Sequence, residues 1–216
     1  MEPSARFRHH IIMDNTPVNM DNAIANKDDA LINIKKELRA NMNGIASAHM
    51  RQTADYRVNW GIELPRLSDI ASEFEPSRTL AQQLWNESVR ECKILACMLM
   101  PTDDCDEDTC DIWAESIHTE EIATMFCLYL AQRLPYASSK AFQWIASENE
   151  TLHVCGYLTL CHLMRKHEMS HEAQQEFLDQ ASTALNNRYA IKALQIYASL
   201  SKDNAKSVKN IADYLG

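Results

Sequence analysis

The chain has 216 residues, enough for one domain of ordinary size with its own apolar core. Its 4 glycines and 6 prolines are few and helix-forming residues dominate, so the composition predicts an all-α fold. The net charge is −9, and residues 61–135 carry the excess with 5 basic and 15 acidic groups. Because phosphate neutralisation supplies most non-specific affinity for nucleic acid, such binding here requires a local basic stripe.

The cysteines and the hydropathy pattern bear on the compartment. Seven cysteines are scattered through apolar helical runs, where thiols behave as small hydrophobes, and they favour a reducing cytoplasm. No apolar run approaches the roughly 20 residues that cross a bilayer. We therefore expect a cytoplasmic protein without a membrane segment, and we expect it to be a monomer without a cofactor.

The first regular pattern along the chain begins at Asp28. Residues 1–26 show no apolar period and are expected to be a poorly ordered lead-in, with residues 27–216 forming a single domain. A helix is predicted over residues 28–41 because its apolar residues share one face: Ala30, Leu31, Ile34 and Leu38. Pro65, at a first-turn position, predicts the start of another helix.

A repeat follows in the rest of the chain. Four apolar helical segments align on Leu95, Leu128, Leu158 and Leu194, with steps of 33, 30 and 36 residues. A shorter amphipathic segment precedes each of them, at residues 80–85, 112–117, 141–145 and 177–185. Helix pairs at this period predict a HEAT-like repeat α-solenoid, with stacked antiparallel pairs, an armadillo-type superhelix and a concave face. The irregular steps leave a compact, non-repeating helical bundle as the alternative.

Two local motifs resemble metal sites. His167-Glu168-Met169-Ser170-His171 has the spelling of a zinc-peptidase motif, but Ser170 is typical of a cap that opens a new helix and no third ligand follows. An acidic run places carboxylates at positions 1, 3, 5 and 12 of a calcium loop: Asp104, Asp106, Asp108 and Glu115. Thr109 stands where such a loop needs glycine, so we expect exposed carboxylates beside a helix start and no metal site.

Three blocks of sequence carry a family likeness. They are residues 59–71 (NWGIELPRLSDIA), residues 80–85 (LAQQLW) continuing into 89–96 (VRECKILA), and residues 144–149 (WIASEN). In this order and spacing they resemble the AlkD-like DNA alkylation repair proteins, which are HEAT-like repeat DNA glycosylases. The likeness covers residues 28–215, and the segment 36–44 resembles a divergent small-protein branch of the same family.

The resemblance implies DNA binding on the concave face and release of cationic alkylated purines. It places the family's catalytic aspartate on Cys127, its two lesion-contacting tryptophans on Ala123 and Ile196, and its phosphate-binding arginine on Val154. All four side chains are therefore replaced. Residues 122–147 contain no Asp or Glu, and a thiol does not supply the preorganised negative charge that stabilises a cationic transition state.

The sequence therefore predicts a HEAT-like repeat protein that binds DNA or RNA without glycosylase catalysis. Two alternatives stay open: a non-catalytic protein-interaction scaffold, and an active alkylpurine glycosylase that uses an unidentified residue. Basic residues on the concave face would favour nucleic acid, whereas an acidic or apolar lining would favour a protein partner. The candidate nucleic-acid ligands are Arg51, Arg57, Arg66, Arg90 and Lys93.

Overall fold

A computed structural model describes the backbone of residues 20–53, 56, 58–166 and 169–215, and the side chains of residues 29–52, 56, 58–166 and 169–211. The secondary structure of that part of the chain is helical, apart from one isolated parallel bridge between Val58 and Val89. The all-α prediction is confirmed. None of the helices in the described ranges is long and apolar enough to cross a membrane.

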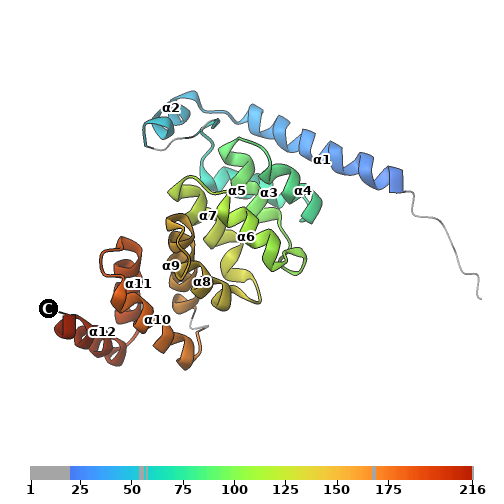
Figure 1. Cartoon of the computed structure of the whole chain (residues 1–216). Helices are drawn as coiled ribbons and strands as arrows, with labels where there is room; N and C mark the ends of the chain where they lie inside the picture. The colour runs from blue at the N-terminus through green and yellow to red at the C-terminus, as the bar shows by residue number, and fades with distance from the viewer. Residues whose placement is uncertain (1–19, 54–55, 57, 167–168, 216) are drawn as a thin grey trace, which may run out of the picture.

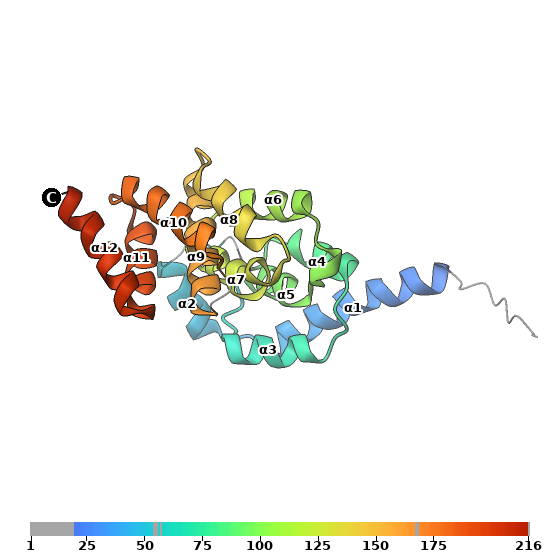
Figure 2. The same cartoon turned by 90° about the horizontal axis from the view of Figure 1, so that it is seen from below.

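Two rows of helices run along the molecule (Figures 1 and 2). The first row contains α5 (Arg90–Leu99), α7 (Glu120–Tyr129), α9 (Glu150–Arg165) and α11 (Arg188–Leu200). The second row contains α4 (Arg78–Trp85), α6 (Glu107–Glu115), α8 (Ala137–Ile145) and α10 (His171–Thr183). Neighbours in the first row pack on one another, and α4 packs on α5, α8 on α9 and α10 on α11. The predicted stack of helix pairs is confirmed.

The two ends of the stack carry the remaining helices. One end has α1 (Met20–Ala40), α2 (Gly44–Thr53) and α3 (Leu64–Ser72), and the other has α12 (Lys202–Leu215) packed on α11. Both α2 and the α11–α12 pair extend past α7 on the same side, which makes the first row the floor of a concave face (Figure 1). Short 3₁₀ turns, Thr102–Asp104 and Ala131–Arg133, connect the central helices.

Helix α1 begins earlier than its apolar pattern indicates. The sequence predicts a start at Asp28, whereas the helix runs from Met20. Ile34 and Leu38 in its second half are fully buried, and the backbone of its first half projects away from the stack (Figure 1). The expected poorly ordered lead-in therefore overlaps the helix, and residues 1–19 lie outside the described residues. The single domain over residues 27–216 stays a prediction.

Three of the four leucines that the repeat predicts to be buried between the rows are buried. Leu95, Leu158 and Leu194 are buried, as expected. Leu128 is only half-buried, because Phe126 and Cys127 take the core positions of α7. The register of the repeat is therefore shifted by about one residue in this helix.

A run of aromatic rings ties the central helices together. Trp85 of α4 stacks on Trp113 of α6 with ring centroids 4.3 Å apart, and Phe126 of α7 lies 6.2 Å from Trp85 and 5.8 Å from Trp144 of α8. Buried indole N–H groups need acceptors. Trp85 donates to Ser116 Oγ at 3.0 Å and Trp144 to Asp111 Oδ1 at 2.8 Å.

Side-chain caps fix where the helices start. In each case the cap oxygen accepts a hydrogen bond from a main-chain N–H in the first turn, which satisfies an otherwise unpaired donor. The caps are Asp106 for α6, Thr119 for α7, Asn149 for α9, Ser170 for α10 and Asn187 for α11. Pro65 lies in the first turn of α3, as predicted.

Candidate functional site

A groove of about 690 Å³ opens where the N-terminal ends of α7, α9 and α11 meet. Capping residues Thr119 and Asn187 lie in its wall, and the small apolar side chains Ala123 and Val154 lie between them. Ala123 and Val154 are the positions where the resemblance places a lesion-contacting tryptophan and a phosphate-binding arginine. The groove is thus present, but these two functional side chains are absent from it.

Cys127 lies inside the protein, not in the groove. Its side chain is completely buried, and its Sγ donates a hydrogen bond to the main-chain oxygen of Cys155 at 3.3 Å. This bond joins α7 to α9. The neighbouring Cys127 thiol, together with burial, raises the pKa of the Cys155 thiol well above its usual value. The position implied for the catalytic carboxylate is therefore closed to substrate, and Ile196, the fourth replaced position, is half-buried on α11.

The groove carries its own carboxylates, which come from helix N-termini. Glu148 and Glu150 are exposed at the start of α9, and Glu120 at the start of α7 pairs with Arg188. Carboxylates near helix N-termini are favoured by the helix dipole, which explains why these residues stand there. This edge of the concave face is acidic, and it disfavours a phosphate backbone.

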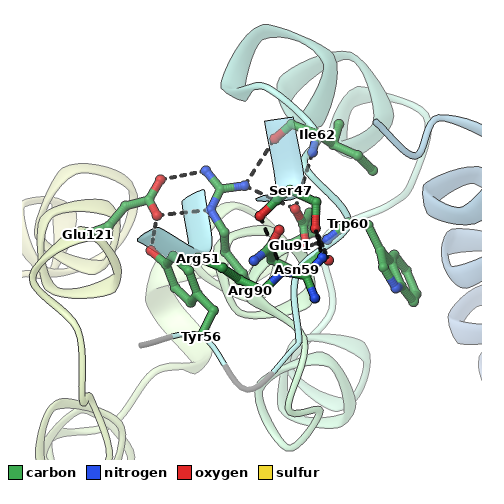
Figure 3. Close-up of polar contacts among 9 residues, drawn as sticks. All are labelled: Ser47, Arg51, Tyr56, Asn59, Trp60, Ile62, Arg90, Glu91 and Glu121. Carbon is green, nitrogen blue, oxygen red and sulfur yellow. Dashed lines mark hydrogen bonds and ion pairs between the residues drawn. The ribbon is translucent and has the colours of Figure 1, made fainter. Parts of the chain in front are cut away.

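Glu121 is the acidic residue nearest in sequence to Ala123 and Cys127, and its carboxylate is already occupied (Figure 3). Oε2 accepts a hydrogen bond from Arg90 Nε at 2.9 Å, Oε1 pairs with Arg90 Nη2, and the Tyr56 hydroxyl bonds to Oε2 as well. Burial raises the pKa of Glu121. A carboxylate held in this way is a structural ion pair and has no free oxygen directed at the groove.

Arg90 and Glu91 anchor the loop between α2 and α3 (Figure 3). Arg90 Nη1 donates to Ile62 O at 3.0 Å and to Glu91 Oε1 at 3.1 Å. Glu91 accepts from the main-chain N–H groups of Trp60 at 3.0 Å and Ile62 at 3.2 Å. Between them Gly61 has φ +72°, and a Cβ there would lie 2.2 Å from Asn43 O. Glycine is therefore required for the loop to reach this buried pair.

Arg90, one of the candidate nucleic-acid ligands, is buried. The side chain is 3% exposed, and each of its nitrogens has a partner in the cluster just described. Burial is the main cause that lowers the pKa of Arg90. The residue stabilises the fold and does not present its guanidinium to an external phosphate.

The other candidate ligands that the structure describes each have a partner within the protein. Arg66 lies among Glu37, Asp69 and Glu73, with N–O distances of 3.8 to 4.0 Å. Lys93 donates to Trp85 O at 2.6 Å and lies over the Trp85 ring, where it caps the end of α4. Arg51 is exposed and donates to Ser47 Oγ at 3.0 Å. Arg57 lies outside the described residues.

The described residues of the two metal-like motifs have structural roles. Ser170 accepts from Ala173 N at 3.2 Å and opens α10 as predicted, whereas His167 and Glu168 lie outside the described residues. Asp104, Asp106 and Asp108 are exposed, as expected. Asp106 caps α6 and pairs with Arg78 at 2.7 Å, and the hydrogen bonds from Thr109 and Arg78 lower its pKa to about 2. Among the described residues, no three His, Cys, Asp or Glu side chains are grouped as metal ligands.

Comparison with known proteins supplies the family context for this geometry. Residues 34–194 match the family model described as DNA alkylation repair enzyme. One solved structure, described as "A new family of proteins related to the HEAT-like repeat DNA glycosylases with affinity for branched DNA structures", superposes with a TM-score of 0.76. The match has 16% sequence identity and covers 86% of this chain and 83% of the other, so it shows the HEAT-like repeat fold. No curated protein matches the chain.

Proposed function

We propose, from the premise that the chain belongs to the DNA alkylation repair enzyme family, that it binds DNA through its concave face without excising alkylated bases. Excision of an alkylated purine builds positive charge on the sugar, and a preorganised carboxylate stabilises that charge. Under this proposal the chain keeps the DNA binding of the family and lacks its excision of alkylated bases.

The burial of Cys127 carries the proposal against catalysis. A carboxylate at this position in related proteins has to face the substrate, whereas the thiol here is fully buried and hydrogen-bonded to Cys155 O. The nearest carboxylate on the same helix, Glu121, is held by Arg90 and Tyr56. Ala123 and Val154 remove the aromatic packing and the phosphate anchor that would act with it. Residues that act as a unit lose their effect together.

The binding half of the proposal is supported by the fold and by the relative with affinity for branched DNA. A protein that no longer processes a single damaged base can still recognise the shape of DNA, because backbone contacts position a protein without reading sequence. We therefore propose branched DNA as the preferred ligand, with ordinary duplex bound more weakly.

The experiment compares four labelled ligands across a salt series: a duplex, an abasic duplex, a four-way junction and an RNA hairpin. Fluorescence anisotropy should show the tightest binding for the junction, and the affinity should fall steeply as salt rises because phosphate contacts dominate. In parallel, alkylated DNA should release neither 3-methyladenine nor 7-methylguanine above the spontaneous rate. If none of the four ligands binds, the proposal is contradicted. If the RNA hairpin binds more tightly than the junction, the ligand is RNA and not branched DNA.

A protein-interaction scaffold is the second candidate, and the acidic groove favours it. Glu148 and Glu150 are exposed on the groove wall, which suits a basic peptide better than a phosphate. Peptide arrays can be probed with the unmodified protein and with the variant Glu148→Gln/Glu150→Gln. Binding of lysine-rich peptides to the unmodified protein but not to the variant would support the scaffold. It would fail if both proteins gave the same weak, salt-sensitive signal.

A further inference from the structure

The C-terminal end of α9 gathers positive charge from two helices. His162 is half-buried, and its pKa is lowered by burial and by the nearby cations Arg165, Lys166 and Lys192. Arg165 and Lys166 end α9, whereas Lys192 comes from α11, and all three side chains are exposed. Three cations from two helices therefore lie near enough to one imidazole to disfavour its protonation.

A groove of about 390 Å³ extends this positive region toward α7. Lys166 and Arg133 lie in its lining together with Gln132, Leu134, Pro135, Ala137, Ser138 and Leu163. Arg133 is exposed and donates to Tyr129 O at 2.9 Å, at the end of α7. We call the set Arg133, Arg165, Lys166 and Lys192 the basic edge. It crosses the C-terminal ends of α7 and α9 and reaches α11.

The basic edge differs from the cations that form ion pairs within the described part of the chain. In the described part of the chain, ion pairs engage Arg66, Arg78, Arg90, Lys140 and Arg188. Among the same residues, no ion pair is formed by a member of the basic edge. In a chain of net charge −9, four exposed cations that form no ion pair among the described residues favour the binding of an external anion.

Helix dipoles explain part of this arrangement but not all of it. Arg165 and Lys166 stand at the C-terminus of α9, where positive charge is favoured. Lys192 stands in the second turn of α11, beyond the first turn in which the helix dipole acts. Burial and the charges of Arg165, Lys166 and Lys192 lower the pKa of His162, and a bound anion would relieve the repulsion among these like charges.

The charge also alternates along α9. Its N-terminal end carries Glu148 and Glu150 at the groove, and its C-terminal end carries Arg165 and Lys166 of the basic edge. With 16 residues, the helix separates the two ends by about 22 Å. A polyanion crossing the concave face is therefore repelled at one end of α9 and attracted at the other.

We infer that the basic edge is the site that binds the phosphodiester backbone of DNA, in place of the arginines and lysine expected from the sequence. This inference rests on the proposed DNA binding and assigns its phosphate contacts to Arg133, Arg165, Lys166 and Lys192. The backbone lies along the C-terminal ends of α7 and α9, with the acidic groove on the opposite side of the concave face.

The test is the salt dependence of binding to a labelled four-way junction by the triple variant Arg165→Gln/Lys166→Gln/Lys192→Gln. Loss of three phosphate contacts should weaken binding roughly tenfold or more and reduce the slope of log K against log salt by about 2 to 3. The control variant Lys36→Gln/Lys202→Gln/Lys209→Gln removes the same charge from exposed positions on α1 and α12. It should leave the slope nearly unchanged.

The outcomes separate this inference from the proposed function. If the unmodified protein binds the junction and the two triple variants lose affinity and slope equally, the basic edge is not the phosphate site, although DNA binding stands. If the unmodified protein binds no DNA, both the proposed function and the basic edge are overturned. Both variants should unfold at the same temperature as the unmodified protein. An unchanged unfolding temperature shows that a loss of affinity does not come from a loss of folded protein.

Discussion

The thiol of Cys127 on α7 donates a hydrogen bond to the main-chain oxygen of Cys155 on α9, at a position that solvent does not reach. A hydrogen bond between neighbouring helices of the concave row makes this position part of the packing. The residue that would carry catalysis in related proteins has here become part of the contact between two repeats.

Cys127→Asp should therefore destabilise the protein and should not create a glycosylase. An uncompensated buried carboxylate typically costs about 3 to 5 kcal/mol. Burial raises the folded-state pKa of such a group above its unfolded value, so the penalty should be small below pH 4 and grow as pH rises through the folded pKa. Urea denaturation at pH 4 and pH 8 measures it, with Cys127→Ser as the neutral control. Equal stability of the two variants at pH 8 would show that the position reaches water.

The buried ion pair predicts a second stability effect. Arg90→Met leaves Glu91, which is fully buried, without its cation, and should lower the free energy of unfolding by about 3 to 5 kcal/mol. The matched control is Arg188→Met, which breaks the exposed pair with Glu120 and should change stability little. Urea unfolding measures the free energy of unfolding of both variants. Similar decreases in the two variants would contradict the structural role of Arg90.

The fold could be predicted from the sequence because the signals that specify it are local. Apolar periodicity, Pro65 and the cap Ser170 each act within one helix, and the helix pairs formed as expected. The early start of α1 could not be predicted because the sequence before Asp28 shows no apolar period.

The candidate site was less predictable because its interactions are long-range. Arg90 meets Glu121 across 31 positions of sequence, and no local pattern marks either residue as buried. Lys192 joins Arg165 and Lys166 only because α11 packs on α9. The absence of Asp and Glu over residues 122–147, by contrast, can be read from the sequence alone, and the place of the family's aspartate at Cys127 is what the resemblance implies.

The close contact of α8 and α9 at Gly156 gives a third prediction. A Cβ at this position would lie 2.6 Å from Ile145 Cγ1 and 2.7 Å from Ala141 O, so Gly156→Ala should push the two helices apart and cost about 1 to 3 kcal/mol. Gly44→Ala is the control, because no atom lies within 4 Å of its added Cβ, and it should be neutral or stabilising by about 0.4 to 1 kcal/mol. Thermal melts that rank the two variants in the reverse order would contradict the helix packing.

The acidic run predicts no useful calcium affinity. Asp106 is engaged by Thr109 N and Arg78, and its exposed neighbours Asp104 and Asp108 lack the glycine-centred turn that would bring them around one ion. Calorimetric titration with calcium chloride should give no binding heat. Micromolar binding that disappears in Asp106→Ala would overturn the assignment of this loop as a helix start.

The measurement that tests the central claim most directly is the release of alkylated bases by protein that has been shown to bind DNA. The same preparation is first titrated with a labelled junction and then incubated with DNA containing 3-methyladenine and 7-methylguanine. We predict binding that weakens with salt and no release above the spontaneous rate. Release by the unmodified protein, persisting in Cys127→Ala, would show that another residue takes the role of the missing carboxylate and would contradict the account.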